Sequence, residues 1–193
     1  MILSPTSNSW LRRATSSLVV VLLAILATGP VKAQAASREY DLKAAFLFNF
    51  ATFGEWPDSA FADASSPFVI GVLGTDPFGP ALEEIVAGER VKGRPIVVRR
   101  FDRVEQALGG CQILFVSPTE KRRVKEIISL VRNRPILTVA DVPGFVESGG
   151  LIGFTTGARV GIQVNPVALR EANLNISPKL LRLAEVVAVN SKP

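Results

Sequence analysis

The sequence of 193 residues contains no histidine and a single cysteine, Cys111. Without histidine, the Ser-His-Asp and Cys-His catalytic arrangements and the commonest transition-metal sites are excluded. With one thiol, no disulfide can form within the chain in any compartment. Only carboxylate or lysine chemistry remains as a simple route to catalysis, so we expect neither an enzyme nor a metal or cofactor protein.

The chain also lacks an apolar run long enough to cross a bilayer, which needs about 20 residues. Its most apolar segment, residues 18–27, follows two arginines and precedes small residues up to Ala35. A basic start, a short apolar middle and a small-residue end are typical of a secretory signal peptide. We therefore predict a leader over residues 1–33, cleaved after Ala33 or Ala35, and export to a periplasm. An uncleaved anchor is the alternative.

Charge of one sign is not in large excess once this leader is removed. The formal net charge of +5 falls to +2, because the leader carries Arg12, Arg13 and Lys32 and no acid. Such a balance gives no electrostatic footprint for nucleic acid. Basic runs at 90–103 and 120–126 include acids, which favours solvated faces over a contact with anionic lipid or an acidic partner.

Residues 39–189 alternate apolar runs with amphipathic segments, which predicts one α/β domain with a mainly parallel sheet covered by helices on both faces. The predicted strands are residues 68–74, 95–101, 111–117 and 135–141. The predicted helices are residues 39–56, 77–88, 102–108, 119–133, 166–173 and 178–188, the last two being terminal. In the sequence between the last of these strands and the two terminal helices, residues 150–165 predict an antiparallel hairpin. Its residues Val160, Ile162 and Val164 are expected to face the core.

Four predicted helix starts share one local pattern, a capping side chain followed by proline. They are Asp76-Pro77, Ser117-Pro118, Asn165-Pro166 and Ser177-Pro178. The side chain accepts bonds from free N–H groups, and proline is suited to the first helical position. Because the pattern repeats, helix starts are favoured over anion-binding loops.

The aromatic segment 39–56 predicts a helix with a broad buried face when residues are placed at about 100° intervals. The residues predicted to be core are Leu42, Phe46, Leu47, Phe50 and Phe53. The opposite polar stripe consists of Asp41, Asn49, Thr52 and Glu55. Lys43 is the exception, since it falls on the apolar side.

Two aromatic residues of this segment fall at or near the polar stripe. Phe48 lies within the stripe and Trp56 lies at its edge. An exposed aromatic pair of this kind is a candidate patch for binding a partner. The alternative is that Trp56 ends the helix and packs under the sheet.

Seven blocks of the sequence, in this order, are similar to those of the YfiR family of periplasmic proteins. They are EYDLKAAFLFNFATFGEWP (39–57), VIGVLGTDPFG (69–79), CQILFVS (111–117), ILTVAD (136–141), GLIGF (150–154), RVGIQVN (159–165) and LNISPKLLRLA (174–184). The first and the last blocks are the most specific, and the resemblance covers essentially all of residues 39–189.

This resemblance implies a regulatory binding protein without catalysis. The best-understood members repress an inner-membrane diguanylate cyclase by binding its periplasmic sensor region. An outer-membrane OmpA-like lipoprotein relieves the repression by sequestering them, and members tend to form homodimers. Those three partners are therefore expected here, with cyclic di-GMP signalling and biofilm formation as the controlled output.

The chain departs from the resembled repressor at one position. That repressor carries redox-responsive cysteine pairs, and Cys111 matches one of these cysteines. Gly71 lies where its partner cysteine would be. Control by a disulfide is therefore not expected, and Cys111 is predicted to be a small buried hydrophobic residue.

Two other functions compete with the regulator. A small-ligand receptor would use the crevice at the carboxyl ends of the strands, lined by loops 74–79, 117–119 and 141–144. A hydrolase would use Asp76 and Asp141 on those loops, although no spacing supports a defined pair.

The sequence offers a second candidate surface should Phe48 and Trp56 not bind the partner. It comprises Arg159 in the hairpin and Lys179 in the terminal helix.

Overall fold

The computed structural model describes residues 29–155, 157, 160–178 and 185–186. The chain divides into two compact units, Met1–Arg38 and Glu39–Pro193, and the second is described here. Its strands are β1 (Gly54–Glu55), β2 (Phe68–Leu73), β3 (Arg90–Val91), β4 (Arg94–Phe101), β5 (Ile113–Val116), β6 (Leu137–Ala140), β7 (Ile152–Thr155), β8 (Gly161–Val164), β9 (Asn175–Ile176) and β10 (Glu185–Val186). The helices of the described residues are α2 (Gly29–Phe53), which begins in the first unit, η1 (Asp58–Ala60), α3 (Ala81–Val86), α4 (Val104–Ala107), η2 (Pro118–Arg123), α5 (Val124–Val131) and α6 (Pro166–Glu171).

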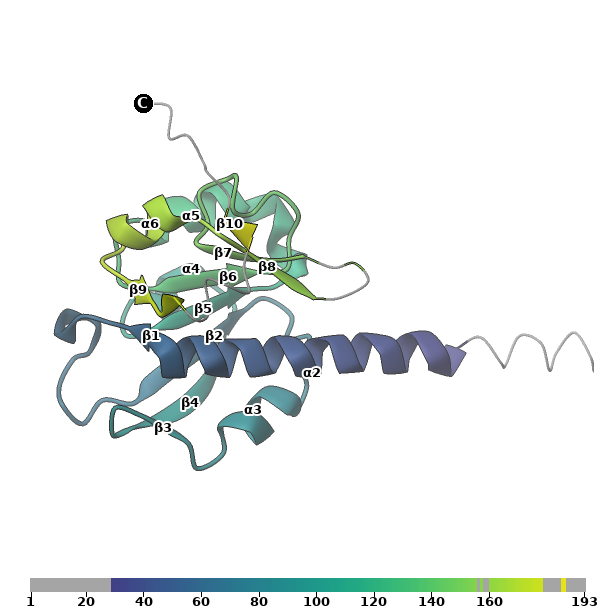
Figure 1. The fold of residues 1–193 in the computed structure, drawn as a ribbon, viewed down its shortest axis with the longest axis horizontal. Coiled ribbons are helices and arrows are strands. Elements are labelled where there is room, and N and C mark those ends of the chain that lie inside the picture. Colours follow the sequence, from purple (N-terminus) through teal and green to yellow (C-terminus); the bar gives the residue numbers. More distant parts are fainter. Residues whose placement is uncertain (1–28, 156, 158–159, 179–184, 187–193) are drawn as a thin grey trace, which may run out of the picture. The chain divides into compact units, whose positions relative to one another are not determined.

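The main sheet has the strand order β10-β8-β7-β6-β5-β2-β4-β3 (Figure 1). The neighbours from β4 through β2, β5 and β6 to β7 are parallel, and β10 is parallel to β8. Strands β7 and β8 form the predicted antiparallel hairpin, and β3 pairs antiparallel with β4. A mainly parallel sheet with a C-terminal hairpin is therefore confirmed.

Helices cover both faces of this sheet, as the apolar character of its strands predicted. Every residue of β2, β5 and β6 is buried, which requires a packed layer on each side. One face packs against α2, α3 and α6 through residues such as Leu47, Leu82 and Leu169. The other face packs against α4 and α5 through residues such as Val104 and Ile127. The single α/β domain is confirmed.

Helix α2 ends three residues earlier than predicted. It ends at Phe53, and the next two residues form β1, which pairs with β9. Gly54 allows this change of direction, because a Cβ atom there would lie 2.7 Å from the carbonyl oxygen of Phe50 and against the ring of Trp56. Trp56 therefore lies beyond the helix. The prediction of a helix over 39–56 was wrong at both ends, since α2 also begins earlier, at Gly29.

The buried face of α2 is also narrower than predicted. Leu47 and Phe50 are core residues and Phe46 is half-buried, as the projection required. Leu42 and Phe53, however, are each 46% exposed, so their assignment to the core was wrong. The sheet lies on one side of α2 only, so residues at the margins of a broad apolar face remain in contact with solvent.

The capping pattern holds at some of the predicted helix starts and fails at one. Asn165 caps α6, because its Oδ1 accepts from the N–H groups of Val167 and Ala168 at 3.1 and 3.0 Å. Ser117 precedes the turn of η2 and accepts from the N–H of Thr119. Asp76 does not cap a helix. Its Oδ1 accepts from the N–H of Phe78 in a tight turn, and α3 begins only after Pro80.

The prediction of a terminal helix over 178–188 was wrong in part. Glu185 and Val186 form β10, which pairs with Gln163 and Val164 of β8. A β-branched segment beside an open strand edge gains ladder hydrogen bonds that a helix would forgo. Residues 179–184 and 187–193 lie outside the described residues.

Candidate interaction surface

A cluster of charged groups lies where β6 ends and α2 crosses the sheet. Lys43 Nζ donates to Asp141 Oδ2 at 2.6 Å and also to Glu39. The hydroxyl of Tyr40 donates to the same oxygen of Asp141 at 2.8 Å. The Lys43 side chain is completely buried, as its place on the apolar side predicted. Two carboxylates compensate this buried cation, which would otherwise carry a large desolvation cost.

Aromatic rings enclose the same cluster. Lys43 Nζ lies 4.6 Å from the ring centroid of Tyr40 and 5.8 Å from that of Phe154. The ring of Tyr40 also meets Phe78 edge-on at 5.6 Å. Burial, and then the bond to Asp141, raise the pKa of the Tyr40 phenol well above its usual value of 10.0. These groups lock α2 onto the sheet, and none of them presents a free acid or base to a substrate.

The two aspartates considered for hydrolysis do not form a pair. Asp76 follows β2 and Asp141 follows β6, and β5 lies between these strands. Asp76 Oδ2 accepts from Arg100 at 2.6 Å, and the same guanidinium also pairs with Glu83. Each aspartate is thus held by its own cation, and Asp76 and Asp141 do not form together a carboxylate pair for acid–base catalysis.

The loops at the carboxyl ends of the strands pack against one another. The N–H of Thr75 donates to Thr119 Oγ1 at 3.2 Å. A Cβ atom at Gly74 would lie 2.6 Å from that oxygen and 2.9 Å from the side chain of Glu120. Asp141 in the third loop is engaged by α2. The geometry therefore gives no support to a ligand crevice between these loops.

The opposite edge of the sheet, at the amino ends of the strands, is different. Trp56 lies here, half-buried, with its ring edge-on to Phe68 at 4.9 Å. Its Nε1 donates to the backbone oxygen of Gln112 at 3.1 Å. Gln112 is almost completely buried and bonds to the backbone of Val69 and Ala60 at 2.7 and 2.6 Å. Trp56 and the loop that follows are thereby fixed to the sheet.

Gln112 was not singled out from the sequence. The available signal was one amide side chain within the apolar run 111–117. A buried amide needs hydrogen-bond partners for its donors and its acceptor. Its position therefore predicts hydrogen bonds to other segments of the chain, but not which segments these are.

Three hollows open around Trp56 and Phe61. Their volumes are about 450, 280 and 200 Å³. Trp56 borders the first and third, and Phe61 borders the second and third. We define the Trp56 surface by residues that line these hollows: Trp56, Pro57, Phe61, Lys92, Arg94, Arg134, Pro135, Arg170 and Leu174.

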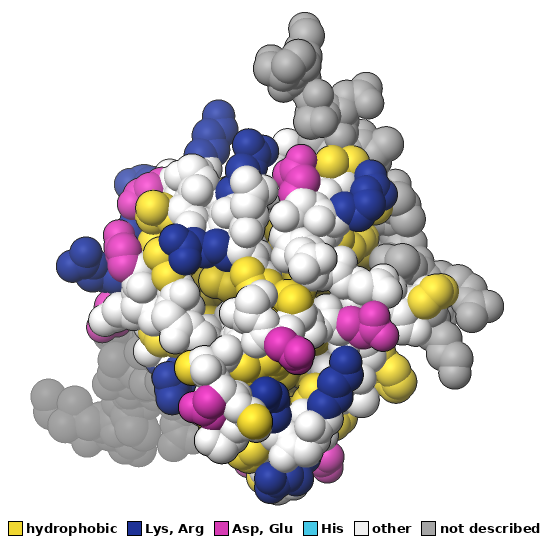
Figure 2. All heavy atoms as spheres, turned by 90° about the vertical axis from the view of Figure 1, so that its left-hand side faces the viewer, with side chains coloured by type: hydrophobic (Ala, Val, Ile, Leu, Met, Phe, Trp, Pro, Cys, Tyr) yellow, Lys and Arg dark blue, Asp and Glu magenta, His cyan; other side chains and the backbone are white. Residues whose placement is uncertain are grey.

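Cations outnumber acids in the lining of these hollows. The cations are Lys92, Arg94, Arg134 and Arg170, and the acids are Glu55 and Asp58. Arg94 is held rigidly, because its guanidinium lies 3.9 Å from the ring centroid of Phe61 and donates to the backbone oxygens of Asp63 and Ser66. Figure 2 shows this side of the molecule, with hydrophobic atoms near the centre and side chains of both charges, Lys and Arg as well as Asp and Glu, among and around them. An apolar centre with a charged rim is the usual anatomy of a protein interface.

The other residues proposed to bind a partner have different positions. Phe48 is half-buried and packs against the core on the α2 side of the sheet. Trp56 lies beyond the end of that helix, so the two rings do not share one helix face as the projection had them. Arg159 and Lys179 lie outside the described residues.

Cys111 is buried, as predicted, but it precedes β5, which begins at Ile113. Its thiol donates to the backbone oxygen of Ile113 at 2.9 Å, and burial raises the pKa of the thiol to about 12. A Cβ atom at Gly71 would lie 2.8 Å from the sulfur of Cys111 and 2.6 Å from the ring of Phe101. A side chain at position 71 would thus meet Cys111. Glycine, however, supplies no second thiol, and a buried thiol of this kind is unreactive.

The fold is that of a small α/β domain, in which Lys43, Asp76 and Asp141 are engaged in internal ion pairs and three hollows surround Trp56 and Phe61. The chain belongs to the YfiR/HmsC-like family, which matches residues 40–185. This confirms the resemblance found in the sequence blocks. Membership of this family supports a regulatory role in the periplasm in broad terms.

Other comparisons add little to this assignment. A conserved domain protein from Vibrio cholerae has a similar solved structure, with a TM-score of 0.44 and 12% sequence identity. The match covers 62% of this chain and 54% of the other, so the chain spans about half the length of that protein. Among curated proteins no match is found. No helix within the described residues is both long and apolar enough to cross a membrane.

Proposed function

We propose that this protein is a periplasmic regulator that represses an inner-membrane diguanylate cyclase by binding its periplasmic sensor region. Family membership supports the regulatory role. The engaged state of Lys43, Asp76 and Asp141 argues against hydrolysis. Export by the predicted leader would bring the domain to the compartment in which such a sensor region lies.

The observation that carries this proposal is the Trp56 surface. Three hollows meet around two aromatic rings, and exposed Lys92 and Arg170 lie at their rims. Partially buried aromatic side chains in preformed hollows are the positions where binding energy concentrates. Because Gln112 fixes Trp56 and Phe61 is stacked under Arg94, the surface is organised before any partner arrives.

Repression through such a surface requires a difference in affinity between two states of the target. The regulator lowers cyclase activity to the extent that it binds the inactive state of the sensor region more tightly than the active state. Competition by an outer-membrane OmpA-like lipoprotein for the free regulator would relieve the repression by mass action.

A photo-cross-linking amino acid placed at Arg170 tests this contact in cells. We expect irradiation to join the protein covalently to one inner-membrane protein, identified by mass spectrometry as a diguanylate cyclase. A matched control carries the same group at Lys125, which is exposed on α5 on the other face of the sheet.

The outcome is read from the difference between the two positions. A cyclase adduct at Arg170 and none at Lys125 supports the proposal. Equal labelling at both positions, or an adduct at Arg170 that contains no cyclase, contradicts it.

A further inference from the structure

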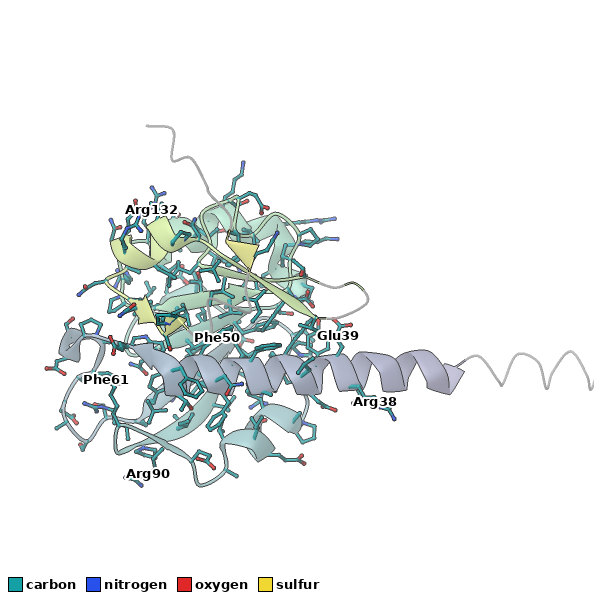
Figure 3. All side chains as sticks on the ribbon, in the orientation of Figure 1. Arg38, Glu39, Phe50, Phe61, Arg90 and Arg132 are labelled. Atoms are coloured by element: carbon teal, nitrogen blue, oxygen red, sulfur yellow. The ribbon has the colours of Figure 1, made fainter. Side chains whose placement is uncertain are left out.

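Aromatic rings form the walls of the third hollow at the Trp56 surface. Phe68 is completely buried, and the half-buried rings of Trp56 and Phe61 lie beside it, with centroids 4.9 and 6.4 Å from its own. Val91 and Gly54 add to this apolar lining. In Figure 3, Phe61 lies in the loop that follows α2, on the side of the β3–β4 hairpin. The hollow is therefore suited to an apolar group.

Arg94 adds a fixed cation to the same lining. Both N–H groups of its Nη1 are used, since this nitrogen donates to the backbone oxygens of Asp63 and Ser66 at 2.8 and 2.7 Å. Its Nε and Nη2 have no acceptor within the described residues. These two nitrogens carry the parallel N–H groups through which a guanidinium binds a carboxylate with two hydrogen bonds. Arg94 is thus held in place by one nitrogen, and its other two nitrogens remain available to an anion.

Lys92 places a second cation at the rim of the hollow. It is exposed at the tip of the β3–β4 hairpin, where φ values of 49° at Lys92 and 83° at Gly93 fit a tight two-residue turn. Among the described residues neither Lys92 nor Arg94 forms an ion pair. The described lining contains one acid, Asp58, which is exposed. Positive charge therefore exceeds negative charge at this hollow.

We propose that the third hollow binds a small organic carboxylate. Its apolar body enters between the rings of Trp56 and Phe61, Arg94 holds its carboxylate, and Lys92 adds attraction at the rim. The volume of about 200 Å³ lies below the roughly 300–1,000 Å³ of sites for drug-sized ligands, so one ring or one branched chain suits it. Aromatic rings also attract organic cations, but the two cations at this hollow repel them.

This ligand site goes beyond the proposed repression and does not depend on it. Binding of a small acid is a property of the domain alone, so it is measured without the cyclase. A protein that binds the acid but no cyclase would refute the repression and keep the site. A protein that binds the cyclase but no acid would refute the site and keep the repression.

Fluorescence of Trp56 in the purified, processed protein tests the proposal. The sequence has two tryptophans, and the other, Trp10, belongs to the predicted leader. Three probes share one body and differ in charge: 3-phenylpropanoate, 3-phenylpropanamide and 3-phenylpropylamine. We expect 3-phenylpropanoate to change the emission saturably, with a dissociation constant of about 1 mM or tighter. The neutral amide should bind about 10-fold more weakly or worse, and the amine should not saturate.

Substitutions then locate the bound acid. Lys92→Asn removes the charge and keeps a residue that tolerates positive φ. It should weaken binding of the acid about 2- to 5-fold and leave binding of the amide unchanged. Arg94→Lys keeps the charge but not the paired donors, and should weaken binding of the acid about 10-fold. Because Arg94 also holds the loop at Asp63 and Ser66, Lys92→Asn and the three probes decide the matter if that variant does not fold.

Two matched controls remove a cation elsewhere. Arg170→Asn changes the first hollow, which Trp56 also borders, and Lys125→Asn changes exposed α5. Both should leave the dissociation constant of the acid within a factor of two. The proposal is overturned if 3-phenylpropanoate causes no saturable change, or if the acid and the amide bind equally. It is also overturned if Arg170→Asn or Lys125→Asn weakens binding as much as Lys92→Asn does.

Discussion

Lys43 and its partners determine how α2 is fastened to the sheet. The cation is completely buried and depends on Asp141 and Glu39 for compensation. Tyr40 shares Asp141 with it, so two side chains of α2 converge on the loop after β6, while Glu39 accepts from Lys43 within the helix. Such a network stabilises the fold only while all its members are present, because each group is buried at the expense of its hydration.

The ionisation of the Tyr40 phenol can be followed by its absorbance and reports on this network, because Tyr40 is the only tyrosine in the sequence. Its folded-state pKa is raised, so its contribution to stability is complete below the unfolded pKa of about 10 and is lost as the pH rises above it. We expect no phenolate absorbance at 295 nm at pH 10.5 in the folded protein. In 6 M guanidinium half-ionisation should occur near pH 10, and a folded protein that titrates there would refute the assignment.

Removing the buried charge should cost considerable stability. We expect Lys43→Met to lower the free energy of unfolding by about 3 kcal/mol, because it leaves Asp141 without its cation. The low end of the usual range applies, since Asp141 is not completely buried. Urea denaturation measures the change. The matched variant Lys125→Met on exposed α5 should alter stability by less than about 0.5 kcal/mol, and equal losses for the two would contradict the network.

At the scale of elements, strand β2 is packed so closely that its glycine is required. A Cβ atom at Gly71 would lie 2.6 Å from the ring of Phe101 in β4 and 2.8 Å from the sulfur of Cys111 beside β5. Both distances are shorter than a normal van der Waals contact. Strand β2, strand β4 and the residues before β5 therefore pack together only because residue 71 has no side chain.

Gly71→Ala should therefore destabilise the domain by about 1–3 kcal/mol through overpacking. Adding Cys111→Ala makes room on one side and should recover part of this loss, which a thermodynamic cycle of the four proteins would measure. Additive effects of the two substitutions would show that residue 71 does not meet Cys111.

Helix α2 allows its buried and exposed aromatic residues to be compared within one element. Phe50→Ala should lower the free energy of unfolding by about 3–5 kcal/mol, since its side chain is in the core. Phe53→Ala should lower it by only about 0.5 kcal/mol, since the residue is nearly half exposed. Chemical denaturation of both variants decides the matter. Comparable losses would mean that Phe53 is packed as the sequence projection first indicated.

Sequence patterns were sufficient for the elements whose residues are determined locally. The strands β2, β4, β5, β6, β7 and β8 and the cap of α6 follow from apolar runs and from Asn165-Pro166, whereas the short strand β3 was not predicted. The end of α2 could not be predicted, because Gly54 is required by the approach of Trp56 and by pairing with β9. The strand character of Glu185–Val186 likewise depends on β8, which is distant in the sequence.

The site was less accessible to sequence reasoning than the fold. Trp56 was predicted as a candidate contact residue, but on a helix face that it does not occupy. The hollows around it arise from several segments that are distant in the sequence and include Phe61, Lys92, Arg134 and Arg170. No spacing along the chain brings these residues together, because the amino ends of parallel strands gather them only when the sheet forms.

At the scale of the whole molecule, the two edges of the sheet have opposite characters. At the carboxyl ends of the strands, charged side chains form ion pairs within the domain, such as Lys43–Asp141 and Arg100–Asp76. At the amino ends, aromatic rings and exposed cations surround open hollows. A molecule built in this way is suited to binding another protein, which agrees with the broad regulatory role that its family supports.

The intracellular level of cyclic di-GMP is the measurement that tests this account most directly. Deleting the gene should raise the level several-fold, and the wild-type protein should restore it. Lys92→Glu with Arg170→Glu, present in the periplasm in equal amount and folded, should fail to restore it, because the rim of the Trp56 surface is reversed in charge. An unchanged cyclic di-GMP level on deletion, or full restoration by the reversed variant, would contradict the account.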